Sequence, residues 1–280
     1  MSVDGQVSLL QAIVLAILQG ITELFPVSSL GHAVVIPHLL NWQIDQAAPT
    51  FLPFLVTLHL GTAVALLVYF WSDWWALLTS LLSQAPDRAT RENRYLLWLI
   101  VLGTVPTGLI GLVLEKRLQA LFAQYLIVAV FLILNGLMLF GAEWLRRRQL
   151  FQNLSELRPG QAIAIGLCQA IALLPGFSRS GATMAGGLLV GLTHQASARF
   201  AFLLSTPIIF AAALLELPKL LQPALRPALG PALIGGIVAG IVAYLSTVVL
   251  MRYFKRNEVN ALLPFGVYCA LLGVVALVAG

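Results

Sequence analysis

Long apolar runs, separated by short polar segments, dominate the pattern along this chain of 280 residues. A helix that crosses the roughly 30 Å hydrocarbon layer of a membrane needs about 20 apolar residues. Six runs are long and apolar enough, and they cover residues 51–70, 95–114, 120–142, 200–217, 231–251 and 261–280. The pattern therefore predicts an all-α integral membrane protein with six transmembrane helices.

Two further apolar stretches, 7–40 and 161–192, are interrupted in the middle. Each interruption contains proline, serine, glycine and an ionisable residue, at 23–32 in the first stretch and 175–181 in the second. Irregular backbone at membrane depth is tolerated only where protein or a water-filled cavity satisfies its polar groups. We predict that each stretch forms a re-entrant pair of helices.

The two interruptions also resemble each other at a constant offset along the chain. The identical pairs are Gln19 and Gln169, Ile21 and Ile171, Leu24 and Leu174, Ser28 and Ser178, and Gly31 and Gly181. Each half contains a re-entrant pair followed by three spans, so residues 1–150 and 151–280 are predicted to be two repeats in one membrane domain. Because three is odd, the second repeat starts on the opposite side of the membrane, which is an inverted topology typical of transporters.

Basic residues predict which side of the membrane each loop occupies. One side carries Arg88, Arg91, Arg94, Arg146, Arg147, Arg148, Arg158, Arg199, Arg252, Lys255 and Arg256. The other side carries Lys116, Arg117, Lys219 and Arg226. The positive-inside rule places the first side in the cytoplasm and both termini outside.

Composition agrees with a membrane protein and excludes other classes. Hydrophobic residues make up 60% of the chain and charged residues 10%, whereas a soluble domain averages about 25% charged residues. The two cysteines, Cys168 and Cys269, lie in apolar runs and provide neither a disulfide framework nor metal-ligand spacing. The net charge of +5 is small and dispersed, so we expect membrane lipids around the chain and no nucleic-acid partner.

Ionisable residues inside the broken stretches are the first candidates for chemistry. Such groups are costly in a membrane and mark function by default, and Glu23, His32 and Arg179 are the clearest cases. The structural alternative is an ion pair between Glu23 and Arg179 that holds the two loops together. The sequence leaves open whether His59, in the run 51–70, faces this site or packs between helices.

Hydroxyl groups surround these residues: Ser28, Ser29, Ser178, Ser180 and Thr183. Any one of them could simply cap or bridge a helix. As a cluster, however, Ser-Arg-Ser-Gly at the start of a helix suits an oxyanion, because an arginine fork, backbone N–H groups and the helix dipole all favour negative charge. The sequence therefore predicts a substrate with an anionic head group.

At these residues the chain resembles the undecaprenyl pyrophosphate phosphatase family, also called the bacitracin-resistance family of membrane phosphatases. Residues 19–32, QGITELFPVSSLGH, match its first signature: Glu or Gln, three residues, Glu, and then Pro-Val-Ser-Ser-x-Gly-His. Residues 175–183, PGFSRSGAT, match the second, Pro-Gly-x-Ser-Arg-Ser-x-x-Thr. The resemblance in length and segment order extends over essentially the whole chain.

The resemblance implies hydrolysis of a C55 isoprenyl diphosphate on the outer side of the bacterial plasma membrane, which regenerates the carrier lipid for cell-wall synthesis. By matching position, it implies catalytic roles for Glu23, Ser29, His32 and Arg179. Substrate-binding roles fall on Gln19, Ser28, Ser178, Ser180 and Thr183. The active site would face the periplasmic or extracellular side, and the resemblance leaves a homodimer open.

The resemblance also implies dependence on Mg²⁺ or Ca²⁺, with Glu23 and Gln19 as the metal-binding residues. Gln19 departs from family members that have two acids here, which removes one carboxylate. The nucleophile stays open between three routes. Ser29 could attack with His32 as base, His32 could activate water, or the imidazole could attack directly.

Two other readings compete with this one. A secondary transporter or lipid flippase would use the same inverted repeats, although it needs no nucleophile or acid–base histidine. Another phosphatase family combines K-x₆-R-P, P-S-G-H and S-R-x₅-H signatures. The last histidine is missing here, because Ala185 and its neighbours occupy that region. We therefore favour the first family.

Overall fold

The computed structural model describes residues 7–42, 44–46, 48–84, 86–122, 124–146, 153–220, 222 and 229–279. Three of the basic residues used for the topology, Arg147, Arg148 and Arg226, lie outside these ranges. The side chains of Lys116, Arg117 and Lys219 are also outside the description.

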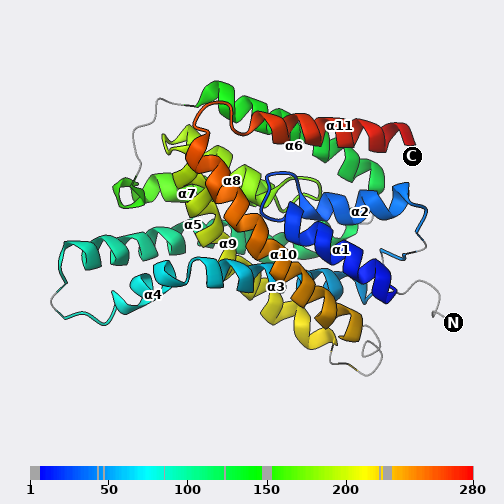
Figure 1. The fold of residues 1–280 in the computed structure, drawn as a ribbon, viewed down its shortest axis with the longest axis horizontal. Helices are drawn as coiled ribbons and strands as arrows, with labels where there is room; N and C mark the ends of the chain where they lie inside the picture. The colour runs from blue at the N-terminus through cyan, green and yellow to red at the C-terminus, as the bar shows by residue number, and fades with distance from the viewer. Residues whose placement is uncertain are drawn as a thin grey trace.

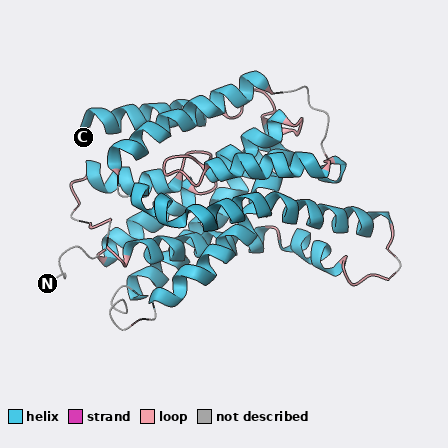
Figure 2. Cartoon of the chain, turned by 180° about the vertical axis from the view of Figure 1, so that it is seen from behind, coloured by secondary structure: helices cyan, strands magenta, loops and turns pink. Residues whose placement is uncertain are grey.

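The described part of the chain is all helix and loop, with no strand, as Figure 2 shows. The helices are α1 (Leu9–Thr22), α2 (Ser29–Leu39), α3 (Phe51–Tyr69), α4 (Trp71–Thr79), α5 (Arg88–Phe122), α6 (Tyr125–Leu145), α7 (Pro159–Ile171), α8 (Arg179–Leu189), α9 (His194–Leu220), α10 (Leu229–Arg256) and α11 (Leu263–Ala279). A short 3₁₀ helix, η1 (Leu154–Glu156), precedes α7. The predicted all-α class is confirmed.

Five of these helices are long and apolar enough to cross a membrane, namely α3, α5, α6, α9 and α10. The sixth predicted span corresponds to α11, which has 17 residues and so extends over about 26 Å at 1.5 Å per residue. The chain is therefore a multi-pass membrane protein. Its exact number of crossings stays a prediction.

Both interrupted stretches are broken helices. α1 ends at Thr22 and α2 starts after Ser28, while α7 ends at Ile171 and α8 starts after Ser178. In Figure 1 the turn between α1 and α2 and the turn between α7 and α8 lie inside the helical body and not at its ends. The predicted position of each break is confirmed.

The structure also contains an element that the hydrophobic pattern did not indicate. The predicted spans 51–70 and 95–114 leave the residues between them as a connection. The chain instead forms α4 there, and α5 begins at Arg88 and not near residue 95. The Asp87 carboxylate accepts a hydrogen bond of 2.8 Å from the Thr90 N–H and so caps the start of α5. Hydrogen bonds from Thr90 hold the pKa of Asp87 below its usual value.

Small residues allow the central helices to approach closely. α3 packs against α10 where Gly61 meets Gly236, and a Cβ atom on Gly61 would overlap the Gly236 backbone. α7 packs against α5 in the same manner, where Gly166 meets the backbone of Gly103. Such contacts are common between membrane helices, because dispersion rather than the hydrophobic effect holds them together. Along one side of the body, α6 and α11 lie side by side (Figure 1).

Candidate active site

The two broken helices meet at a cavity of about 260 Å³. Its polar lining consists of Glu23, Ser28, Ser29, His59, Ser178 and Arg179. α3 and α9 contribute apolar walls that include Leu52, Val56, Ile208 and Ala212. A water molecule takes about 30 Å³ in the liquid, so the cavity has room for a group of several heavy atoms. Its lining combines charged and hydroxyl side chains with apolar ones.

A buried asparagine on α6 joins the two turns that form the cavity. The Asn135 Nδ2 donates to the Pro26 carbonyl at 3.1 Å, and its Oδ1 accepts from the Ser178 N–H at 2.9 Å. Ser180 adds a second link, because its hydroxyl donates to the Phe25 carbonyl at 3.1 Å. The local pattern did not single out Asn135, although an amide in the middle of the apolar run 120–142 was an available signal.

Glu23, at the end of α1, is the centre of the polar cluster. One carboxylate oxygen, Oε1, accepts from the Arg179 guanidinium. The other, Oε2, accepts from the Ser29 hydroxyl at 2.5 Å and from the Gln19 amide at 3.0 Å, and His59 Nε2 lies 3.2 Å away. The ion pair considered from the sequence is therefore present. Both of its partners also line the cavity, so the pair does not exclude a functional role.

The N-termini of α2 and α8 both lie at this cavity. Ser28 and Ser178 are their N-caps, and each side-chain oxygen accepts a hydrogen bond of 3.1 Å, from the N–H groups of Gly31 and Gly181 respectively. Two helix N-termini concentrate positive potential where an anion would bind. Ser28 also has a φ of 68°, a left-handed conformation that costs a non-glycine residue about 1–3 kcal/mol and is often found at functional sites.

His32 does not line the cavity. Its side chain is buried, with 1% relative exposure. Nδ1 lies 2.7 Å from the Ser28 carbonyl, which can only accept, so Nδ1 carries the proton. Nε2 then accepts from the Tyr268 hydroxyl at 2.8 Å. The imidazole is therefore turned toward α11.

The remaining candidates lie behind the cavity wall. Gln19 supports Glu23 from the last turn of α1. The Thr183 hydroxyl donates to the Arg179 carbonyl at 2.8 Å, one turn into α8, and is buried. The structure thus brings Glu23, Ser28, Ser29, Ser178 and Arg179 together around one space. Gln19, Ser180 and Thr183 lie behind them and His32 faces away.

The donor atoms set limits on how this site could hold a divalent cation. Among the described residues, no group of three or more His, Cys, Asp and Glu side chains could hold a metal ion. The Glu23 carboxylate and the Gln19 amide oxygen are too few for a complete coordination sphere. Mg²⁺ is commonly bound through one or two carboxylates plus substrate phosphates. The residues therefore fit a cation that shares its ligands with a phosphate group.

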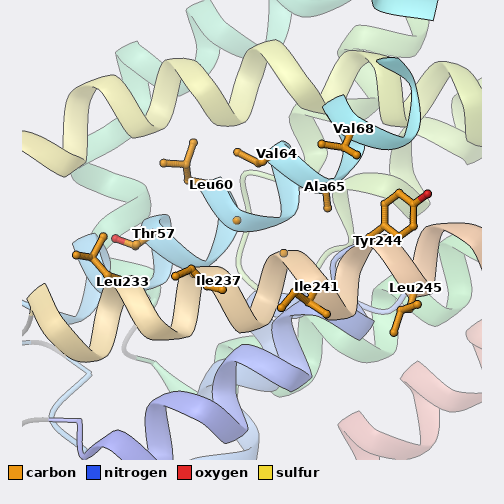
Figure 3. A pocket seen from close by; sticks show the side chains of 13 residues that line it. Thr57, Leu60, Val64, Ala65, Val68, Leu233, Ile237, Ile241, Tyr244 and Leu245 are labelled. Carbon is orange, nitrogen blue, oxygen red and sulfur yellow. The ribbon is translucent and has the colours of Figure 1, made fainter. Parts of the chain in front are cut away.

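A larger, open groove of about 560 Å³ runs along the surface where α3 and α10 meet (Figure 3). It is lined almost entirely by apolar side chains, among them Leu60, Val64, Ile237 and Ile241, and by the glycines at the helix contact. None of the lining residues carries a charged group. This lining offers no carboxylate, histidine or basic side chain for acid–base chemistry, in contrast to that of the smaller, polar cavity.

The chain is similar to known proteins over nearly its whole length. The family model described as bacitracin resistance protein BacA matches residues 12–275. A protein of Chromobacterium violaceum named undecaprenyl-diphosphatase 2 is 53% identical over 96% of this chain and 97% of its own length. A protein of Acidiphilium cryptum named undecaprenyl-diphosphatase is 52% identical over 95% of this chain and 96% of its own. The chain therefore belongs to the BacA family of bacitracin resistance proteins.

Proposed function

We propose that this protein hydrolyses undecaprenyl diphosphate to undecaprenyl phosphate and inorganic phosphate. The observation that carries the proposal is the cavity in which Arg179, two helix N-termini and the Ser29 hydroxyl converge. The names of the most similar relatives describe the same activity. The apolar side chains of the cavity lining suit the lipid part of such a substrate, and its charged and hydroxyl side chains suit the diphosphate.

The terminal phosphoryl group binds at the start of α8. The Arg179 guanidinium can contact two phosphate oxygens, and the first N–H groups of α2 and α8 add donors. The Ser178 hydroxyl lines the same space. In the transition state, negative charge is spread over the equatorial oxygens of the phosphoryl group, and fixed donors stabilise it without reorganisation. Ser28, Ser180 and Thr183 keep these groups in place.

Ser29 is the attacking group that the contacts support best. Its hydroxyl lines the cavity and donates to Glu23 at 2.5 Å. Attack of Oγ on the terminal phosphorus breaks the bond to the bridging oxygen, which leaves with the lipid monophosphate, while the hydroxyl proton passes to Glu23. Water then hydrolyses the phosphoserine. For His32 to act as base or nucleophile, its Nε2 must first leave the Tyr268 hydroxyl.

A divalent cation, Mg²⁺ or Ca²⁺, would be held by Glu23 and the Gln19 amide oxygen together with the substrate. When bound, it neutralises charge on the diphosphate. Gln19 and Glu23 lie one helical turn apart, and the Gln19 amide nitrogen donates to Glu23 at 3.0 Å, so the amide group would have to turn over to present its oxygen to the ion.

The chain crosses the plasma membrane of a bacterium six times, with two re-entrant pairs and an inverted repeat of residues 1–150 and 151–280. Crosswise packing between the halves supports the repeat: α1 packs on α10, and α7 packs on α5. Both termini and the active site face the periplasmic or extracellular side. The basic residues near the start of α5 and the end of α10 support a cytoplasmic position for those helix ends.

Phosphate release from undecaprenyl diphosphate by the purified protein in detergent tests the activity. We expect release with added Mg²⁺ or Ca²⁺ and little or none with EDTA. Release that persists in EDTA would contradict the shared cation while leaving the hydrolysis intact. Absence of release under every condition would contradict the proposed function and favour a transporter or flippase of the same architecture.

A further inference from the structure

His59 belongs to the cavity although neither signature segment contains it. It lies in the third turn of α3, and its side chain has 24% relative exposure, against 5% for the Glu23 side chain. Its ring lines the cavity beside Ser29 and Arg179. The sequence left open whether this histidine packs between helices, and the structure places it in the cavity lining, in contact with Glu23.

Both ring nitrogens of His59 face oxygen acceptors. Nδ1 lies 2.8 Å from the Leu55 carbonyl, which fixes the ring along its own helix. Nε2 lies 3.2 Å from Oε2 of Glu23, the same oxygen to which Ser29 donates. Neither acceptor carries a hydrogen, so the two contacts together require the doubly protonated imidazolium form of the ring. In that form the ring donates to the backbone through Nδ1 and holds the carboxylate in a defined orientation through Nε2.

The helix that carries His59 is itself fixed. Two residues later, Gly61 meets Gly236 of α10 in a contact too close for a side chain. The Thr62 hydroxyl donates to the His59 carbonyl at 2.7 Å. A site built on packed helices holds its groups more accurately than one built on loops. The Glu23 carboxylate, which follows the last turn of α1, thus receives a donor from a rigid helix that belongs to neither broken stretch.

Resting on the proposed function, we infer that His59 is a positioning residue of the reaction, acting through Glu23. Its Nε2 donor and the Arg179 guanidinium hold opposite oxygens of the carboxylate. In this orientation Oε2 receives the Ser29 hydroxyl and keeps it pointed at the cavity. Without the donor the carboxylate is free to rotate, and the Ser29 oxygen loses its place relative to the bound phosphoryl group.

Two replacements of His59 separate this role from simple space filling. His59→Leu keeps most of the volume and removes the donor, whereas His59→Gln keeps an N–H donor that can reach Glu23. Because a displacement of about 1 Å can reduce a rate by about a hundredfold, we expect a fall in kcat up to that size for His59→Leu, with KM little changed. His59→Gln should retain a kcat close to that of the wild type.

His38→Leu is the matched control, because His38 is an exposed histidine at the end of α2 that stacks on Tyr125 away from the cavity. It should leave kcat unchanged. A wild-type kcat in His59→Leu would overturn the inference, and so would equal losses in the Leu and Gln variants. If the wild type releases no phosphate, the proposed function fails instead.

NMR of ¹⁵N-histidine-labelled protein tests the contact without relying on turnover or on the folding of His59→Leu. The His59 signals are identified by their absence from His59→Gln. Glu23→Gln should shift the Nε2 signal of His59 and leave those of His38 and His194 in place. A His59 signal that does not respond to Glu23→Gln would overturn the inference.

Discussion

The carboxylate of Glu23 shows how a single buried charge organises the site. Its two oxygens are met by groups from α1, α2, α3 and α8, and each contact satisfies part of a charge that would be costly to bury alone. Arg179 has the same requirement, and its planar fork can serve the carboxylate and a phosphate group together. The ion pair between Glu23 and Arg179 is therefore part of the proposed substrate site.

Arg179→Lys tests the importance of that fork. Lysine keeps the positive charge but offers a point charge in place of two parallel donors. Loss of one fixed donor to a developing charge typically reduces kcat by about 10²–10³, and we expect a fall of that order in phosphate release from undecaprenyl diphosphate. Arg88→Lys, an exposed residue paired with Glu92 at the start of α5, serves as the control. An Arg179→Lys variant as active as this control would contradict the role of the fork.

At the scale of elements, the site depends on helix contacts that place two turns next to each other. Asn135 on α6 satisfies a carbonyl of the first turn and an N–H of the second, so one side chain sets their distance. The close contact between α3 and α10 sets the position of His59 in turn. Packing outside the cavity therefore controls geometry within it.

Gly61→Ala tests the contact between α3 and α10. The new methyl group would overlap the Gly236 backbone, and overpacking of this kind costs about 1–3 kcal/mol. We expect a lower thermal unfolding temperature in detergent. Gly108→Ala on α5 is the matched control, because a Cβ atom there has no neighbour within 4 Å. Equal unfolding temperatures of the two variants would contradict this prediction, because they would mean that α3 and α10 can move apart without a loss of stability.

At the scale of the whole molecule, large apolar side chains cover much of the outside of the described helices, while several polar side chains are buried among them. Large apolar side chains are exposed along the helices, among them Val113, Leu214, Ile237 and Val278. Glu23, His32 and Ser178 are buried. This distribution suits lipid as the solvent, and it agrees with a multi-pass membrane protein.

Cysteine labelling in intact cells tests the proposed orientation. We expect Leu40→Cys, exposed after α2, to react with a membrane-impermeant maleimide, because that loop is placed outside. Gln84→Cys before α5 and Lys255→Cys near the end of α10 should react only after the cells are opened. The wild type provides the blank, since Cys269 is buried and Cys168 lies within α7. The reverse labelling pattern would show the opposite orientation.

The sequence by itself determined the solvent, the helical class, the two breaks and most of the polar residues of the cavity. Each of these depends on neighbours within a few positions, because apolar run length and helix-breaking residues act locally. The serine and arginine residues of the cavity lie in those breaks for the same reason. α4 was missed because its nine residues are too few for a span.

Only the tertiary structure decided which side chains meet. Asn135 lies 109 positions from Pro26, and Arg179 lies 156 positions from Glu23, yet helix packing brings both pairs into contact. His32 lies in a signature segment and His59 in an uninterrupted apolar run, and no local pattern shows which of them contacts Glu23. The rotation of α3 and α2 about their own axes turned His59 toward Glu23 and His32 toward Tyr268. That rotation is set by the neighbouring helices, which a local pattern does not encode.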